Sequence, residues 1–101
     1  MISVAVIGGG ASGMAFAVAL KHKRPDIEVT VFEKNPKVLK KILVTGNGRC
    51  NILNFDAVAE NYFEACEFVR PAVEKYAPKK TEAIFRDMGL LLMSEQEGRA
   101  Y

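Results

Sequence analysis

The stretch "VAVIGGGASGMAFAVAL", Val4 to Leu20, decides the fold of this 101-residue chain. The Val- and Ile-rich run Ile2 to Ile7 predicts a strand that is covered on both faces in a parallel sheet. Beyond the glycines, Ala11 to His22 predicts a helix, because basic residues and then Pro25 mark its end. A second β-branched strand follows at Val29 to Phe32. Together these elements predict an α/β fold that begins with a right-handed βαβ unit.

Three glycines at the junction of the first strand and the helix form the pattern G-x-G-x-x-G: Gly8 and Gly10 precede the helix, and Gly13 lies in its first turn. The first permits a tight turn, the second lets the backbone approach a pyrophosphate, and the third lets helix and strand pack closely. The helix N-terminus offers unpaired N–H groups and a partial positive charge to phosphates. The pattern therefore predicts a Rossmann-like dinucleotide site.

Glu33 lies twenty residues beyond Gly13, at the end of the second strand. A carboxylate at this place can accept hydrogen bonds from the hydroxyls of a ribose, and it disfavours the 2′-phosphate of NADP. The motif alone leaves NAD and FAD open. The alternative interpretation is that the glycines form only a turn and that Glu33 is an ordinary acid at a strand end.

A second glycine cluster follows in "LKKILVTGNGRCN", Leu39 to Asn51, within a stretch from Lys34 to Phe55 that contains no acid. A basic loop with accessible backbone suits a second contact with a bound dinucleotide. Composition alone allows a solvated basic loop equally well. Cys50 has no partner at a redox or zinc spacing, so we expect it to assist binding or packing, and we expect Cys66 to be a buried small hydrophobe.

The remaining sequence predicts a helical pair and a hairpin. The chain is expected to form the N-terminal part of an FAD/NAD(P)-binding domain, with three segments: the βαβ unit at 1–34, the basic glycine loop at 35–55, and the helical pair and hairpin at 56–101. The expected elements are a helix at Phe68 to Tyr76 with Pro71 in its first turn, a helix at Lys79 to Met88 ended by Gly89, a strand at Leu90 to Met93, a turn at "EQEG", and a return strand at Arg99 to Tyr101.

Composition excludes several classes of protein. Half of the residues are hydrophobic and the net charge is +2, which is typical of a globular domain and too small to attract nucleic acid or an anionic membrane in bulk. Glycines interrupt the longest apolar run, so no membrane span is expected. No basic residue precedes that run, so no secretion signal is expected and a cytoplasmic location is favoured. The spacing of potential ligands predicts no metal site.

Two motifs together carry a family resemblance. "VIGGGASGMAFAVAL…VTVFEKN" with "KKILVTGNGRCNILN" resembles the bacterial NAD(P)/FAD-dependent oxidoreductases of the aminoacetone-oxidase-like type, and the second motif is the more specific. The tail, "FVRPAVEKYAPKKTEAIFRDMGLLL" and "EGRAY", is also similar, whereas Phe55 to Glu67 matches least. The resemblance implies an extended FAD, with its ADP half on the glycine fingerprint and its flavin end near the T-G-x-G-R-C-N loop. It also implies NAD(P)H as an electron donor in the intact protein.

The resemblance assigns binding residues but no catalytic ones, because flavin chemistry resides in the cofactor. It implies that the ADP half contacts Gly8, Gly10, Ala11, Ser12, Gly13, Glu33 and Lys34. It implies that the remainder of FAD contacts Lys41, Thr45, Gly46, Gly48, Arg49, Cys50 and Asn51.

The chain departs from this family in length. Members of the family are several times longer, so we expect an incomplete domain whose missing strands come from C-terminal segments of the same protein. The alternative is a short protein that completes its sheet by self-association.

The leading hypothesis for function is an FAD-dependent oxidoreductase that is inactive as this piece alone, with an unknown substrate. The alternatives are an RNA-modifying flavoprotein and a non-catalytic nucleotide-binding or assembly module. The basic stretch favours RNA, but Phe55 is its sole nearby aromatic, and the acids between Asp56 and Glu74 offset its charge, so nucleic acid is not the expected partner.

Overall fold

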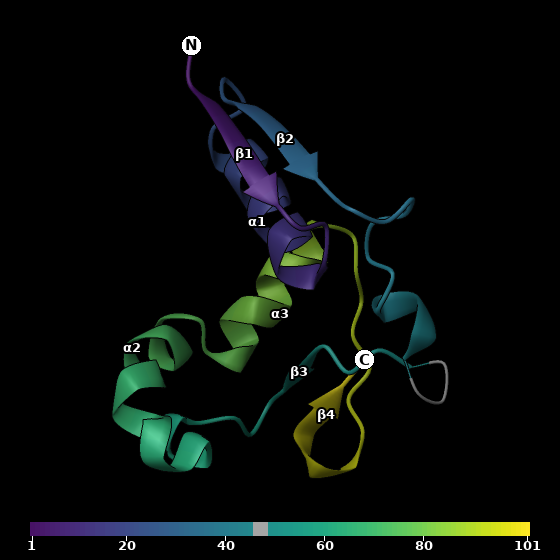
Figure 1. The fold of residues 1–101 in the computed structure, drawn as a ribbon. Helices are drawn as coiled ribbons and strands as arrows, with labels where there is room; N and C mark the ends of the chain where they lie inside the picture. Colours follow the sequence, from purple (N-terminus) through teal and green to yellow (C-terminus); the bar gives the residue numbers. More distant parts are fainter. Residues whose placement is uncertain (46–48) are drawn as a thin grey trace. The chain divides into compact units, whose positions relative to one another are not determined.

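The structure is a computed structural model that describes residues 1–45 and 49–101. The chain divides into two compact units, Met1–Gly48 and Arg49–Tyr101, which are described separately below. Figure 1 labels the helices and strands of both units.

The first unit contains the βαβ arrangement that the sequence predicts. Strand β1 (Ser3–Ile7) leads into helix α1 (Ala11–Lys23), and strand β2 (Glu28–Phe32) returns beside β1 (Figure 1). The two strands are parallel, with Ser3 opposite Glu28 and Ile7 opposite Phe32. The α/β fold class and the parallel pairing are therefore confirmed.

Helix α1 covers one face of this two-stranded sheet. Val6 and Ala17 are buried between strand and helix, and Ile27 is buried where the chain enters β2. The opposite face of the sheet carries Ile7 and Phe32, whose exposed fractions are 82% and 56%. The expectation that β1 would be covered on both faces is therefore not met in this unit, because the described residues supply one layer of helix.

The Lys21 side chain fixes the end of α1. Lys21 donates from Nζ to the carbonyl oxygens of Pro25 at 2.7 Å and Ile27 at 2.9 Å. A cation at the C-terminal end of a helix is also favoured by the helix dipole. These contacts tie the helix end to the turn that starts β2.

After β2 the chain returns to the glycine loop. The N–H of Leu39 donates to the carbonyl oxygen of Gly9 at 2.7 Å, and a short 3-10 helix, η1, follows at Ile42–Val44. This short helix was not predicted from the sequence. The contact brings Leu39, which lies within the basic stretch that begins at Lys34, beside the glycine loop of the first unit.

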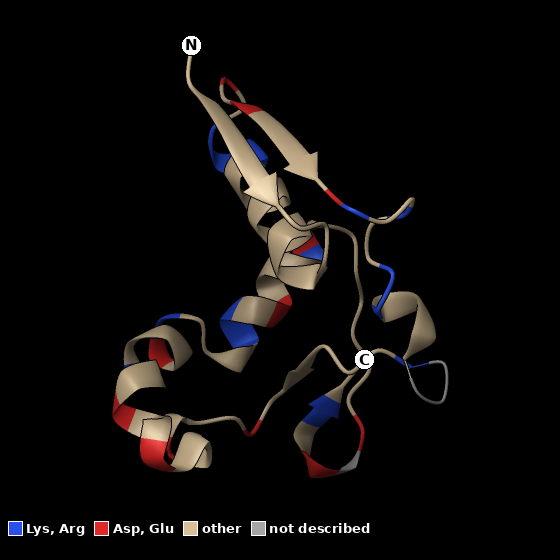
Figure 2. Cartoon of the chain, viewed as in Figure 1, with Lys and Arg blue, Asp and Glu red and all other residues tan. Residues whose placement is uncertain are grey.

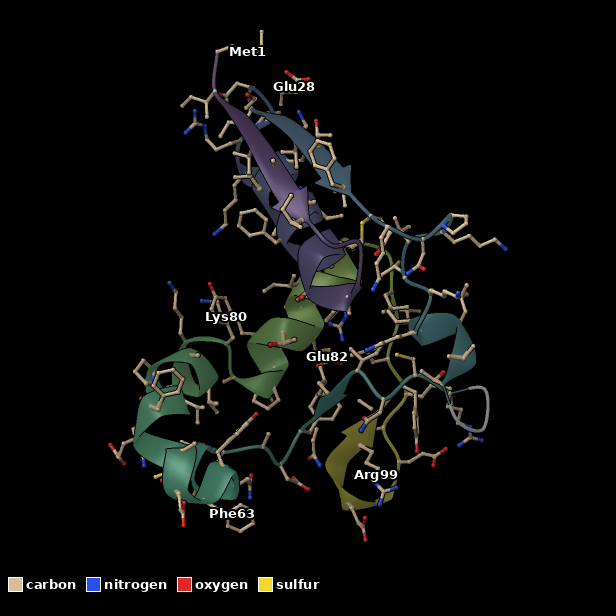
Figure 3. The ribbon with its side chains drawn as sticks, in the orientation of Figure 1. Met1, Glu28, Phe63, Lys80, Glu82 and Arg99 are labelled. Carbon is tan, nitrogen blue, oxygen red and sulfur yellow. The ribbon has the colours of Figure 1, made fainter. Side chains whose placement is uncertain are left out.

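The second unit combines short strands with a helical pair: β3 (Leu53–Asn54), η3 (Ala59–Ala65), α2 (Cys66–Lys75), α3 (Pro78–Asp87), η4 (Gln96–Gly98) and β4 (Arg99–Ala100). Both predicted helices are present. The prediction that Pro71 lies in the first turn of its helix is wrong, because Pro71 is the sixth residue of α2. The 3-10 helix η3 packs against α2, and its Phe63 is almost fully exposed (Figure 3).

Gly89 ends α3 as predicted, at a backbone φ of 88°. The N–H of Leu90 donates to the carbonyl oxygen of Phe85 at 2.9 Å. The N–H of Gly89 donates to the carbonyl oxygen of Arg86, also at 2.9 Å. This pair of bonds is the Schellman arrangement, in which a glycine takes the left-handed position.

The strand pairing at the end of the chain differs from the predicted hairpin. Residues Leu90–Met93 form no strand, and β4 pairs antiparallel with β3, with Leu53 opposite Ala100. On its other side, Tyr101 exchanges two backbone hydrogen bonds of 3.0 Å with Met93. The return strand was predicted correctly, but its partner in β3 was missed, because two residues carry no detectable strand pattern.

No helix among the described residues has both the length and the apolar character needed to cross a membrane.

Candidate dinucleotide-binding site

Two of the three fingerprint glycines are required by the protein itself. Gly8 has a φ of 99°, which side chains rarely adopt, and its N–H donates to the carbonyl oxygen of Phe32 at 2.7 Å. A Cβ on Gly13 would lie 2.0 Å from the carbonyl oxygen of Gly8. Gly8 therefore makes the turn, and Gly13 lets α1 approach the loop.

Gly10 differs from its neighbours because the fold does not require a glycine there. Its φ of −82° and ψ of −170° are open to any residue. A Cβ built on it would meet no atom of the described residues within 4 Å. The missing side chain instead keeps a space open at the start of α1, where a ligand can approach the backbone.

The N-terminus of α1 is suited to an anion. The helix begins at Ala11, no side chain of the described residues caps it, and its first turn contains no acid. The first backbone N–H groups of a helix have no partners within the helix, and the dipole places partial positive charge there. Ala11 and Ser12 are exposed, so a phosphate could reach these N–H groups.

Glu33 lies beside the glycine loop. Its side chain is close enough that a Cβ on Gly9 would come within 3.2 Å of the Glu33 Cβ. The Glu33 residue is half-buried, and its Oε2 accepts a 3.4 Å hydrogen bond from the N–H of Asn35. The carboxylate of Glu33 thus belongs to the same local structure as the glycines, at the carboxyl end of β2.

A basic segment follows Glu33 in the first unit. Its exposed lysines are Lys34, Lys37, Lys40 and Lys41, and Figure 2 shows the blue positions that follow β2. Because the N–H of Leu39 is hydrogen-bonded to Gly9, the middle of this segment lies beside the loop. Thr45 is half-buried and donates from Oγ1 to the carbonyl oxygen of Ile42 at 3.1 Å. Its hydroxyl hydrogen is therefore used within the protein.

The other predicted binding residues do not all belong to this unit. Gly46 and Gly48 lie outside the described residues, and Arg49, Cys50 and Asn51 belong to the second unit. Cys50 is half-buried with a free thiol. The seven residues that share the βαβ unit and its strand ends are Gly8, Gly10, Ala11, Ser12, Gly13, Glu33 and Lys34.

Arg49 has partners that the sequence did not indicate. It forms an ion pair with Glu95, and its guanidinium carbon lies 5.4 Å from the centre of the Tyr101 ring. Both partners lie more than forty residues away along the chain, so no local motif links them to Arg49. They meet because the segment after Arg49 is bonded to the return strand, with Ile52 donating to Ala100 at 2.9 Å.

The prediction that Cys66 is a buried small hydrophobe is wrong, because Cys66 is only half-buried. Its thiol contacts Oε1 of Glu67 at 3.5 Å, and Arg70 donates to its sulfur at 3.8 Å. Cys66 starts a helix whose polar side chains surround it, which explains the difference. Among residues 1–45 and 49–101, no three His, Cys, Asp or Glu side chains gather so as to hold a metal ion.

Comparison with known proteins places the chain in a family. The family model described as "HI0933-like protein Rossmann domain" matches residues 2–101. The chain therefore belongs to the HI0933-like Rossmann-domain family.

Three curated proteins illustrate the likeness. A 3-dehydro-bile acid delta(4,6)-reductase of Clostridium scindens is 38% identical over 95 residues, which cover 93% of this chain and 23% of that protein. A ribosomal RNA dihydrouridine synthase of Haemophilus influenzae is 28% identical over 97 residues, which cover 95% of this chain and 24% of that protein. A protoporphyrinogen oxidase of Saccharomyces cerevisiae is 57% identical over 30 residues, which cover 30% of this chain and 6% of that protein. The chain thus spans about a quarter of the length of the first two.

Proposed function

We propose that this member of the HI0933-like Rossmann-domain family binds the ADP half of FAD and forms the cofactor-binding part of an FAD-dependent oxidoreductase. One observation carries the proposal: Gly10 leaves an open space beside the uncapped N-terminus of α1, although the fold does not require a glycine there. A bound pyrophosphate explains both features, because it needs close backbone approach and unpaired N–H donors.

Different residues of the βαβ unit would bind different parts of the cofactor. The N–H groups at the start of α1 would donate to the pyrophosphate, and the carboxylate of Glu33 would accept from the ribose hydroxyls. The exposed Lys34 and Lys41 would add positive charge around the phosphates. FAD, when bound, supplies the transfer of hydride or single electrons, and the chain orients it.

The two relatives that cover most of this chain favour a reductive activity. The names of the two relatives that cover most of this chain, a delta(4,6)-reductase and a dihydrouridine synthase, both describe chemistry that adds hydrogen to a substrate. We therefore propose that the protein reduces an organic substrate with NAD(P)H as the electron donor. The narrower likeness to aminoacetone-oxidase-like enzymes belongs to the same proposal. The strands that complete the sheet would come from other segments of the protein or from a second copy.

The test of the cofactor uses the protein expressed at its full length. Replacing Gly10 with Val fills the open space, so the purified Gly10→Val protein should lose its flavin absorbance and bind FAD at least 10-fold more weakly by titration. Ala19→Val is the matched control, because Ala19 is exposed on the same helix. FMN, which lacks the AMP part of FAD, should bind poorly to the unvaried protein. An undiminished FAD content in the Gly10 variant would remove the proposal.

A second candidate, an RNA-modifying flavoprotein, is favoured by the likeness to a ribosomal RNA dihydrouridine synthase and by the run of exposed lysines after β2. Neutralising Lys37 and Lys40 together should then weaken RNA binding and reduce its salt dependence, while FAD content stays unchanged. If the protein reduces small molecules only, the same double variant keeps its activity.

A further inference from the structure

Gly9 is the middle residue of the run Gly8 to Gly10, and the G-x-G-x-x-G pattern does not require a glycine there. It is buried, whereas Gly10 is exposed. Its φ is not positive, so the backbone conformation alone does not need a glycine. The reason is steric, because a Cβ built on Gly9 would lie 2.9 Å from Cγ1 of Val38 and 3.2 Å from Cβ of Glu33. The missing side chain therefore makes room for two side chains of the first unit.

Val38 is held against Gly9 by the residue that follows it. The N–H of Leu39 donates to the carbonyl oxygen of Gly9 at 2.7 Å. Leu39 has a φ of 57°, in the left-handed region that residues other than glycine rarely adopt. The hydrogen bond thus stabilises a backbone conformation that is otherwise unfavourable. Because valine is also stiff at χ1, the Val38 side chain has little freedom to make way for a Cβ on Gly9.

Glu33 is held by the end of strand β2. Immediately before it, the carbonyl oxygen of Phe32 accepts a 2.7 Å hydrogen bond from the N–H of Gly8. The half-buried Glu33 side chain then packs where a Cβ of Gly9 would lie, and its Oε2 accepts a 3.4 Å hydrogen bond from the N–H of Asn35. The direction of the carboxylate is therefore set before any ligand arrives. A carboxylate held in this way loses less side-chain entropy when it binds a ligand.

We propose that Gly9 is a positioning residue for ribose recognition: its missing side chain lets Glu33 pack against the glycine loop, which directs the carboxylate toward the hydroxyls of the adenosine ribose. This step rests on the proposed function. The open space at Gly10 and the start of α1 mark where phosphates approach, and Gly9 connects that place to Glu33. A Cβ on Gly9 would force Glu33, Val38 or the loop itself to shift. Hydrogen bonds weaken with distance and misalignment, so the ribose hydroxyls would be bound less well.

The experiment titrates ADP and 2′,3′-dideoxy-ADP into the full-length protein after its flavin is removed. Dideoxy-ADP keeps the base and the phosphates but lacks the ribose hydroxyls, so the ratio of the two affinities measures ribose recognition. The unvaried protein should bind ADP more tightly than dideoxy-ADP. Gly9→Ala should lower this ratio about 3- to 10-fold, the scale of one lost hydrogen bond, while dideoxy-ADP binds as before.

A second substitution tests whether the effect arises from crowding. Val38→Ala removes Cγ1, the atom closest to a Cβ on Gly9, and by itself should leave the ratio unchanged. Added to Gly9→Ala, it should restore most of the ratio, because residues that share a contact are coupled. Some loss should remain, since the Cβ of Glu33 still lies 3.2 Å away. Val44→Ala is the matched control, because Val44 is an exposed valine of the same unit, and it should restore nothing.

Several outcomes would overturn the positioning role. They are an unchanged ratio in Gly9→Ala, an equal loss of both nucleotides, and a failure of Val38→Ala to restore the ratio. If Gly9→Ala is too unstable to titrate, the double variant takes its place, and a ratio equal to that of Val38→Ala alone would overturn the role. If the unvaried protein binds neither nucleotide, the proposed function falls as well. If it binds both equally well, only the role in ribose recognition is lost.

Discussion

The two units of the chain are organised by contacts of different range along the sequence. In Met1–Gly48, the strands, the helix and the glycine loop all lie within about thirty residues, and the strand pairing, with Ser3 opposite Glu28, joins residues about 25 positions apart. In Arg49–Tyr101, the sheet forms only when Leu53 meets Ala100, with the helical pair between them. Local motifs therefore carry the nucleotide fingerprint, whereas the surroundings of Arg49 depend on chain closure.

The largest expected change in unfolding free energy comes from a substitution in the glycine loop of the first unit, Met1–Gly48. Gly13→Ala places a Cβ 2.0 Å from the carbonyl oxygen of Gly8, a backbone atom that cannot rotate away. We expect a loss of about 2–3 kcal/mol of unfolding free energy, as for overpacking of a tight contact. Urea denaturation measures it.

Gly10→Ala is the matched variant for this prediction. Its Cβ meets no described atom within 4 Å, so its unfolding free energy should stay within about 0.5 kcal/mol of the unvaried protein. Equal destabilisation by the two alanines would contradict the distinction between a glycine that the fold requires and one that a ligand requires.

The next largest change in unfolding free energy is expected in the second unit, Arg49–Tyr101, whose two strands are distant in the sequence. Gly98 has a φ of 74°, and a Cβ there would lie 2.4 Å from Oδ1 of Asn54 and 2.5 Å from Oδ2 of Asp56. These atoms are side-chain ends that can shift, so Gly98→Ala should cost about 1–2 kcal/mol, mainly from the left-handed backbone. Denaturation followed by near-UV circular dichroism of the tyrosines would detect it. A loss as large as that of Gly13→Ala would show that the closing turn is as constrained as the glycine loop.

The difference in range also explains what could be predicted from the sequence. The glycine spacing, the apolar strands and the acid Glu33 specify the βαβ unit, since each signal lies beside the element that it defines. Gly89 likewise ended a helix at the expected place. The binding roles of these residues stay predictions.

The rest could not be predicted because its signals are short or distant. Strand β3 has two residues, too few to show an alternating pattern. The partner of Arg49 is an acid forty-six residues away, and nothing near either residue indicates the pairing. Pro71 lies beyond the first turn of α2 because the helix begins two residues before the expected start, at Cys66.

A smaller effect concerns the shape of the Arg49 side chain. Arg49→Lys keeps the positive charge but loses the planar fork that can contact Glu95, the Tyr101 ring and a ligand together. We expect FAD to bind about 3- to 10-fold more weakly, the scale of one lost hydrogen bond. Isothermal titration of the full-length protein measures this, with Arg99→Lys as the control. An unchanged affinity would assign Arg49 to the solvated surface.

The smallest effect is a pH dependence that arises from Arg70 in the second unit. Its guanidinium contacts Glu60 and Glu67 at 2.9 Å each and Glu74 at 3.6 Å. The hydrogen bond from Arg70 lowers the pKa of Glu67 below its ordinary 4.5. The pKa of Glu60 is lowered first by a backbone hydrogen bond and then by Arg70. A carboxylate with a depressed pKa in the folded state stabilises the fold above its ordinary pKa, and this stabilisation is lost as the pH falls through the folded value.

Arg70→Gln should therefore lower the unfolding free energy at pH 7 by a small amount, because all these acids are exposed. The difference from the unvaried protein should shrink below pH 4.5, as Glu60 and Glu67 become protonated in both proteins. Thermal unfolding between pH 3 and pH 7 measures it, and Arg86→Gln, which removes a single pair with Glu82 on α3, is the control. A difference that stays constant across this range would mean that Arg70 acts through the packing of its stem on α2.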